Sequence, residues 1–383
     1  MRLNKLFILY SLFGILMASC IKDEAPNAEA DITGISFEED VLANSYIDLN
    51  PSYDESQNAY PIRISVKEGT DMTSLAPIFE LTPGATISPA SGSVQNFTTP
   101  VRYTVTSEDK AWHRVYAITA REQKASNIPT TYHFEKVRIM QNVWQEFYEE
   151  QDSGNELTWA SGNKGFKWAM SEAATEDYPT TQIDNGKTGK CVKLETRLTG
   201  DLGNMVGMPI AAGNLFIGSF DMLNATNPLS ATRFGTPFYN KPLRLTGYYK
   251  YKAGEQFYEN GEYTSRKDIF NIYAIFYDGV KYDSAGKGTD VTLDGNLPNQ
   301  NYEHSSMVAL ALVSNPQETE GDEWKFFDIP FDYQRYGKKI DEARLAKGEY
   351  KIGIIFASSK DGATFEGAPG STLLIDEVEL IYE

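Results

Sequence analysis

Apolar residues along most of this chain recur at every second position within short runs. Such alternation over a few residues is typical of half-buried β-strands. The first group of runs lies between residues 31 and 122, and turn clusters rich in Gly, Pro, Asp and Ser separate its members. The runs are Thr33–Glu38, Ile62–Val66, Ile78–Leu81, Val101–Thr106 and Val115–Ala120. This pattern predicts a small β-sandwich.

A polar linker over residues 123–130 separates these runs from a second, longer group over residues 131–383. Its main members are Val192–Thr196, Leu215–Asp221, Leu243–Lys252, Phe270–Tyr277, Met307–Val313, Trp324–Pro330, Tyr350–Ser358 and Thr372–Tyr382. A further strand is expected to begin at Thr131. The first and last of the main runs, Val192–Thr196 and Thr372–Tyr382, are predicted to pair. A short helix is expected only at Asp341–Lys347. Many strands without intervening helices predict an all-β protein whose larger domain is a jelly roll.

The N-terminus has the three parts of a secretory signal. Arg2 and Lys5 precede an uncharged apolar run, Leu6–Met17, which is too short to cross a bilayer as a helix. Residues 1–19 are therefore predicted to be a signal peptide. Met17-Ala18-Ser19-Cys20 resembles the lipobox of bacterial lipoproteins, and this resemblance implies that Cys20 carries the lipid, with palmitate among its acyl chains.

Residues 20–30 are polar and rich in Pro and Ala, as expected of a tether. Lys22, Asp23 and Glu24 follow the predicted lipidation site. They resemble the surface-export signal of lipoproteins from Gram-negative glycan-degrading gut bacteria. This resemblance implies a lipid-anchored protein of the outer membrane, exposed at the cell surface.

The chain is strongly acidic, with a formal net charge of −18. Loss of the two cations Arg2 and Lys5 with the signal peptide makes it −20. Such a surface repels phosphate backbones, which argues against a nucleic-acid partner. Contact with a membrane is expected through the N-terminal lipid only. With Cys20 lipidated, Cys191 alone remains and is expected to be a small residue in a strand.

Motifs of enzymatic chemistry are absent from the sequence. The three histidines form no His-x-x-x-His pair, and no Gly-x-Ser-x-Gly elbow occurs. A glycosidase needs only two carboxylates, and 53 acidic residues leave such a pair open. The sequence therefore favours a protein without catalytic residues but does not exclude a glycoside hydrolase.

Glycan binding needs flat apolar rings for the C–H faces of sugars and polar groups for their hydroxyls. Trp159 and Trp168 flank a stretch rich in Gly, Ser and Asn that contains Asn163 and is expected to be a loop. Tyr249 and Tyr251 share one face of a predicted strand. Lys360 and Asp361 follow another strand. These seven residues are the candidate ligand-binding set, although the aromatic members could equally fill a jelly-roll core.

Several segments of residues 130–383 together resemble a family described as a putative carbohydrate metabolism domain. They are Trp159–Gly165, Ala211–Gly218, Phe234–Phe238, Gly247–Lys252, Ser358–Gly362 and Gly370–Val378. The resemblance implies a β-sandwich of surface lipoproteins that is associated with glycan use and brings no catalytic residues. Leu81–Pro89 and Val101–Asp109 resemble the Ig-like domains that lie between lipid anchor and functional domain in such proteins, which implies an Ig-like spacer over residues 31–122.

Carbohydrate-binding jelly rolls often hold a structural calcium ion between their first and last strands. Glu135 and Asp376 stand at similar places and supply the oxygen ligands that calcium prefers. The resemblance therefore implies a structural calcium site, while exposed acids on edge strands are the alternative.

Three functions follow from the sequence. The first is a cell-surface lipoprotein that binds a poly- or oligosaccharide without catalysis. The second is a glycoside hydrolase that uses a carboxylate pair. The third is a protein-interaction subunit of a surface assembly.

Overall fold

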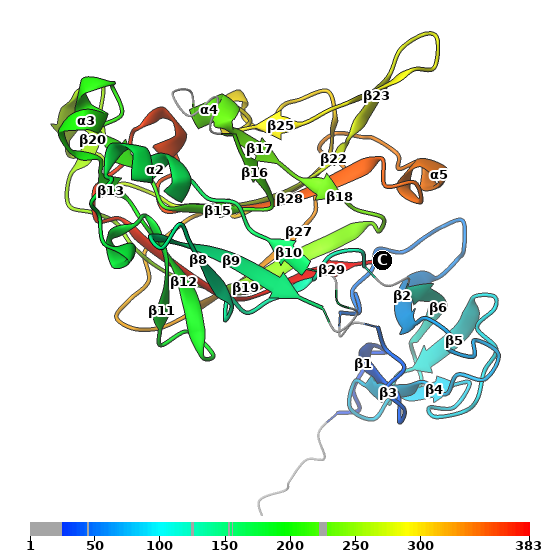
Figure 1. Cartoon of the computed structure of the whole chain (residues 1–383). Coiled ribbons are helices and arrows are strands. Elements are labelled where there is room, and N and C mark those ends of the chain that lie inside the picture. Colours follow the sequence, from blue (N-terminus) through cyan, green and yellow to red (C-terminus); the bar gives the residue numbers. More distant parts are fainter. Residues whose placement is uncertain (1–24, 44–45, 124–125, 152–153, 155, 222–227) are drawn as a thin grey trace, which may run out of the picture. The chain divides into compact units, whose positions relative to one another are not determined.

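The computed structural model describes residues 25–43, 46–123, 126–151, 154, 156–221 and 228–383. The predicted signal peptide and Cys20 lie outside the described residues. The chain divides into two compact units, Met1–Gln123 and Lys124–Glu383, each built mainly from strands (Figure 1). Among the described residues, no helix has the length and apolar character needed to cross a membrane.

The first unit is a small β-sandwich. Its strands are β1 (Ile32–Ser36), β2 (Tyr60–Lys67), β3 (Ile78–Leu81), β4 (Thr86–Ser88), β5 (Val101–Thr106) and β6 (His113–Gln123). One sheet has the order β2-β6-β5-β4, with β2 and β6 parallel, and β1 pairs with β3 in a second sheet. Ile62, Ile64 and Val66 alternate into its core, as period-two strands require.

The second unit contains two large antiparallel sheets. Sheet A has the order β11-β12-β29-β19-β27, with β7 also paired to β29; its strands are β7 (Thr131–Tyr132), β11 (Thr180–Asp184), β12 (Lys190–Glu195), β19 (Pro242–Lys252), β27 (Lys325–Pro330) and β29 (Thr372–Tyr382). Sheet B has the order β15-β28-β22-β26, with β18 also paired to β28; its strands are β15 (Asn214–Phe216), β18 (Thr236–Pro237), β22 (Asn271–Asp278), β26 (Met307–Leu312) and β28 (Tyr350–Ala357).

The order of these strands is that of a jelly roll, which confirms the predicted fold. The chain passes from β12 in sheet A to β15 in sheet B, returns to β19, and goes back to β22 and β26. It then closes through β27 in sheet A, β28 in sheet B and β29 in sheet A. The pairing of β12 with β29 places Val192 opposite Ile375, as predicted for the first and last of the main runs. Strand β7 also pairs with β29, with Tyr132 opposite Val378.

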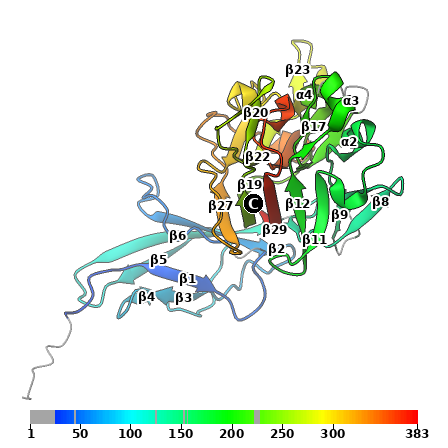
Figure 2. The ribbon, with the colours of Figure 1, turned by 90° about the vertical axis from the view of Figure 1, so that its left-hand side faces the viewer.

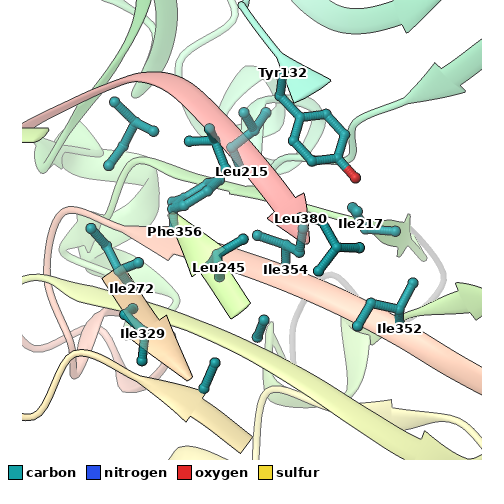
Figure 3. Packing of buried hydrophobic residues seen from close by; sticks show 14 of the residues in the cluster. Tyr132, Leu215, Ile217, Leu245, Ile272, Ile329, Ile352, Ile354, Phe356 and Leu380 are labelled. Carbon is teal, nitrogen blue, oxygen red and sulfur yellow. The ribbon is translucent and has the colours of Figure 1, made fainter. Parts of the chain in front are cut away.

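The main hydrophobic core fills the space between sheets A and B. Figure 3 shows Ile352, Ile354 and Phe356 of β28 among side chains from the other strands. Leu245 of β19 and Ile272 of β22 also belong to this core, and both are fully buried. Burial of this large apolar surface is the main force that holds the two sheets together.

Smaller elements complete the second unit. They are β8 (Val137–Met140), β9 (Trp144–Glu150), β10 (Glu156–Thr158), α2 (Asn163–Ala169), η1 (Thr175–Asp177), β13 (Arg197–Leu198), α3 (Gly200–Met205), β14 (Ile210–Ala211), β16 (Gly218–Phe220), α4 (Pro228–Ala231), β17 (Thr232–Phe234), β20 (Phe257–Glu259), β21 (Glu262–Thr264), β23 (Val280–Tyr282), β24 (Gly288–Asp290), β25 (Leu293–Asp294), η3 (Pro298–Gln300), α5 (Glu342–Leu345) and η4 (Gly362–Thr364). Helix α5 begins where a helix was predicted, and the Asp341 side chain caps it.

One predicted strand, Leu215–Asp221, is two strands in the structure. The chain leaves sheet B after Phe216 and begins β16 at Gly218, which has a φ of +150°. A Cβ atom at Gly218 would lie 2.0 Å from the carbonyl oxygen of Arg233. Only glycine permits this change of sheet, because any side chain would collide with the backbone of β17.

The face of sheet B that points away from sheet A is also covered. The small sheet β16-β17-β25, helix α4 and the adjoining loops lie over it, while α2 and α3 stand at one end (Figures 1 and 2). Tyr273, Ile275 and Tyr277 of β22 pack there against Phe234 and Leu293. Both faces of sheet B are therefore buried, which explains the nearly continuous apolar run of β22.

Candidate functional site

A cavity of about 320 Å³ lies over the outer face of sheet B. Its floor consists of side chains from β15, β22 and β28, including Phe216, Tyr273 and Ile355. Helices α2 and α3, strand β17 and the η4 segment supply the walls. Of the described residues that line it, most are apolar or aromatic, and none is Asp, Glu or His. Concave and largely apolar sites with few polar groups are typical of ligand pockets.

Trp168 and Lys360 are brought together at this cavity although they are distant in sequence. Both line it, Trp168 from α2 and Lys360 from the segment before η4. The Trp168 side chain is 51% exposed, in contrast to the core tryptophans. Among the described residues, the Lys360 ammonium has no hydrogen-bond or ion-pair partner. The edge of the cavity therefore presents an exposed aromatic ring and a lysine ammonium without a described partner.

The segment around Asn163 was predicted to be a loop, but it forms helix α2. Asn163 is fully buried, and its amide is bonded to the backbone of β11: Nδ2 donates to the Thr180 carbonyl at 2.7 Å, and Oδ1 accepts from the Thr180 amide at 3.1 Å. Asn163 is therefore an anchor of α2 and has no free atom for a sugar. Its role is to hold the helix that presents Trp168.

A second anchor of α2 comes from Asn214 on β15. Its Oδ1 accepts a hydrogen bond from the Gly162 amide at 2.8 Å. Gly213 beside it must be glycine, because a Cβ atom there would lie 2.3 Å from the Glu195 amide nitrogen and 2.4 Å from the Pro179 oxygen. This close approach explains the glycine at position 213 of the Ala211–Gly218 segment.

The structure contradicts three members of the predicted glycan-binding set. Trp159, Tyr249 and Tyr251 are 1%, 2% and 3% exposed and belong to the core between the sheets. Trp159 packs on Phe356 with ring centroids 5.8 Å apart, and both tyrosines pack on Phe270. The predicted alternation of β19 is confirmed, but the face that carries these rings points into the core.

Asp361 does not line the cavity. Its carboxylate forms an ion pair with Arg266, which also bonds Glu259 at 3.0 Å. The structure thus separates two neighbours in sequence, since Lys360 faces the cavity and Asp361 is engaged by an arginine. Arg266 leaves Asp361 little capacity for binding a sugar hydroxyl.

The predicted calcium ligands Glu135 and Asp376 both accept hydrogen bonds from the backbone of the turn between β11 and β12. Glu135 accepts a hydrogen bond from the Lys190 amide at 2.7 Å, and Asp376 accepts one from the Thr188 amide at 3.0 Å. Asp376 is fully buried, and this burial raises the pKa of its carboxyl to about 6 despite the backbone donors. The described residues contain no group of three or more His, Cys, Asp or Glu side chains suited to a metal, and calcium here stays a prediction.

Two other titratable side chains of this unit, Asp268 and Cys191, are buried. Asp268 lies beneath the cavity wall and accepts hydrogen bonds from the hydroxyls of Ser359 and Ser371 at 2.5 and 2.7 Å. Burial raises the pKa of the Asp268 carboxyl. Cys191 lies in β12, as predicted, and burial raises the pKa of its thiol to about 12. A thiol in that state is not a nucleophile at neutral pH.

The comparisons with known proteins identify the family. Residues 133–381 match the family model described as the putative carbohydrate metabolism domain. The chain belongs to this family. Residues 48–120 match a second model, the N-terminal domain of SGBP, a surface glycan-binding protein. Both matches confirm the resemblances seen in the sequence, and together they give the protein a glycan-related role at the cell surface.

Two solved structures resemble the protein over most of its length. A putative glycoside hydrolase from Bacteroides thetaiotaomicron is 45% identical and has a TM-score of 0.60, with 94% of this chain and 99% of that chain covered. A putative glycoside hydrolase from Bacteroides vulgatus is 50% identical and has a TM-score of 0.62, with 68% of this chain and all of that chain covered. No curated protein matches the chain.

The floor of the cavity was not predicted from the sequence. Phe216, Phe234, Tyr273 and Ile355 all belong to a hydrophobic cluster on the outer face of sheet B. The signal was present in Asn271–Tyr277, where a strand is apolar on both faces and so must be covered twice. What covers it, and whether the cover leaves a hollow, depends on packing that no local pattern records.

Proposed function

We propose that this protein is a lipid-anchored, non-catalytic glycan-binding protein of the outer surface, and that the cavity over sheet B is its binding site. The family gives the glycan-related role. The observation that carries the proposal is the exposed Trp168 ring at the edge of an apolar cavity whose floor is aromatic. A sugar ring stacked on Trp168 would cover its apolar C–H face at low entropic cost.

Binding without catalysis is favoured by the chemistry of the cavity walls. Glycoside hydrolysis by the usual route needs two carboxylates on opposite sides of the scissile bond. The described lining of the cavity contains none. An acid–base mechanism at this place would have to use groups that the described walls do not supply.

The alternative is a glycoside hydrolase, the activity named for the two similar structures. A second hollow, between β26 and β27, does contain the carboxylates of Asp328 and Asp332. Asp328 is bonded to Arg244 at 2.6 Å, and Asp332 accepts hydrogen bonds from the amides of Gln334 and Arg335. Both carboxylates are therefore used in holding the fold, which favours a binding role over hydrolysis there as well.

The test is binding to an array of plant, host and microbial glycans, followed by calorimetry on the best ligand with three variants. Trp168→Ala should weaken binding about tenfold or more, about 1.4 kcal/mol, because it removes the stacking surface. Lys360→Ala should weaken it a few-fold. Asp361→Asn is the matched control, because Asp361 neighbours Lys360 but lies outside the cavity, and its affinity should equal that of the wild type.

Equal affinities of the wild type and Trp168→Ala would contradict the proposed site. Release of new reducing ends from the bound glycan would establish the hydrolase alternative instead. Labelling with a palmitate analogue, lost in Cys20→Ala, is the expected result for the lipid anchor.

A further inference from the structure

The polar groups in the cavity wall are mostly satisfied within the protein. Most of them bond a neighbouring group of the protein. Asn271 exchanges hydrogen bonds with the Tyr302 hydroxyl at 3.1 and 3.3 Å, and Thr180 donates to the Asn214 carbonyl at 2.8 Å. Asn214, Thr199, Thr232 and Ser359 are engaged in the same way. A sugar ring pushed fully into this cavity would lose water from its hydroxyls without replacement bonds, at a cost of about 1–3 kcal/mol for each.

One buried polar group on the floor is different. Tyr273 is 2% exposed in the middle of β22, and its ring packs against Phe234 and Tyr302 with centroids 6.3 and 5.2 Å apart. Its hydroxyl makes no hydrogen bond with any residue that the structure describes. The hydroxyl is not one of the fully enclosed side-chain atoms that lack a partner, and Tyr273 lines the cavity, so its oxygen is open to the cavity space. A ligand atom placed there can accept a hydrogen bond from it.

The edge of the cavity is apolar as well. Trp168 lies at this edge. Gly203 of helix α3 forms part of the cavity wall, and the same segment exposes several large apolar side chains to solvent. They are Leu202, Met205 and Val206, with Leu198 just before the helix. Apolar side chains gathered beside a cavity favour a ligand that has an apolar group of its own.

We infer that the cavity receives the acetyl group of an acetylated sugar. The methyl group would lie against Phe216, Phe234 and Ile355, the carbonyl oxygen would accept a hydrogen bond from the Tyr273 hydroxyl, and the sugar ring would stack on Trp168 outside. The cavity has room for about ten water-sized groups, enough for an acetyl group and the adjoining part of a ring. This inference rests on the proposed glycan-binding function and names its ligand class.

Acetyl groups occur on sugars as amides and as esters, which share this methyl and carbonyl chemistry. The probes are therefore matched pairs. Chitohexaose and cellohexaose differ at one position of every ring, with an acetamide in the first and an uncharged hydroxyl in the second. Acetylated xylan before and after mild alkali tests the ester, because mild alkali removes ester acetyl groups and leaves amides. The full array, treated with mild alkali and untreated, covers other glycans.

In at least one pair, the acetylated glycan should bind about tenfold more tightly than the unacetylated one. Tyr273→Phe should reduce this ratio of affinities several-fold, because it removes the hydroxyl that is proposed to bond the acetyl oxygen. Since the hydroxyl has no partner in the described part of the protein, the variant should be about as stable as the wild type, so that a loss of binding is not a loss of fold. Phe365→Leu, which alters the wall and keeps the hydroxyl, is the matched control and should preserve the preference.

Three other results are possible, and each would contradict a different part of the account. Glycan binding that ignores acetylation would overturn this inference and leave the proposed function standing. An acetyl preference unchanged in Tyr273→Phe would remove Tyr273 from the account. Absence of binding to every glycan of the panel would overturn the proposed function and this inference with it.

Discussion

The two faces of sheet B show how one set of strands serves both structure and recognition. On the inner face, Ile272, Ala274 and Phe276 of β22 interlock with sheet A in the main core. On the outer face, Tyr273 and its neighbours meet a cover made of short strands, small helices and loops, and a cavity remains. The inner faces of the two regular sheets meet in one continuous apolar core, whereas the irregular cover leaves a cavity over the middle of sheet B. The structural and functional roles therefore alternate residue by residue along β22.

Trp159 and Trp168 represent these two faces and give the largest expected effect. Trp159→Ala should lower the free energy of unfolding by about 3–5 kcal/mol, because it leaves a void beside Tyr132, Phe134 and Phe356. Trp168→Ala should lower it by less than about 1 kcal/mol, because half of its surface is already in water. Denaturant unfolding followed by circular dichroism measures both. Equal losses of unfolding free energy in the two variants would contradict the proposed difference between the two faces.

The outer faces of the two sheets also differ. Sheet A has a buried carboxylate there, that of Asp376, whereas sheet B has a cavity. The pKa of Asp376 is about 6 in the folded protein against an ordinary 3.8. The folded state therefore holds the proton more tightly, and the stability due to this group rises as pH falls. The full effect is about 3 kcal/mol, of which about 1 kcal/mol should be gained between pH 7 and pH 5.

Asp376→Asn should lack this gain, so the difference in unfolding free energy between variant and wild type should change by about 1 kcal/mol over the same interval. A difference that stays constant with pH would show that Asp376 is not desolvated. Millimolar calcium chloride tests the sequence prediction at the same place. Calcium bound to Glu135 and Asp376 would favour the carboxylate and abolish the gain on acidification.

Much of the fold was predictable because strand periodicity is local. Ile78–Leu81, Val101–Thr106 and Thr372–Tyr382 have the predicted bounds, and the pairing of the first and last of the main runs was also predicted. The exception at Leu215–Asp221 arises from Gly218, whose conformation takes the chain from one sheet to another. That effect depends on the backbone of β17, which comes later in the chain.

The site was predictable only in part, because exposure depends on long-range packing. Trp168 and Lys360, two of the predicted ligand-binding residues, lie beside one cavity, and their binding role stays a prediction. Trp159, Tyr249 and Tyr251 are aromatic as well but lie in the core. Nothing local distinguishes Trp159 from Trp168. Asn163 was predicted to bind the ligand, but its amide is bonded to the Thr180 backbone and anchors the helix that contains Trp168.

The most direct test of the central claim observes the five tryptophans while a glycan binds. The protein would be labelled with 5-fluorotryptophan, and each ¹⁹F resonance assigned from a Trp→Phe variant. On titration with a glycan that binds in the array, the Trp168 resonance should shift and saturate with the calorimetric affinity, while that of buried Trp159 stays in place. A shift at Trp112 or Trp324 with Trp168 unchanged would contradict the assignment of the cavity over sheet B as the glycan site.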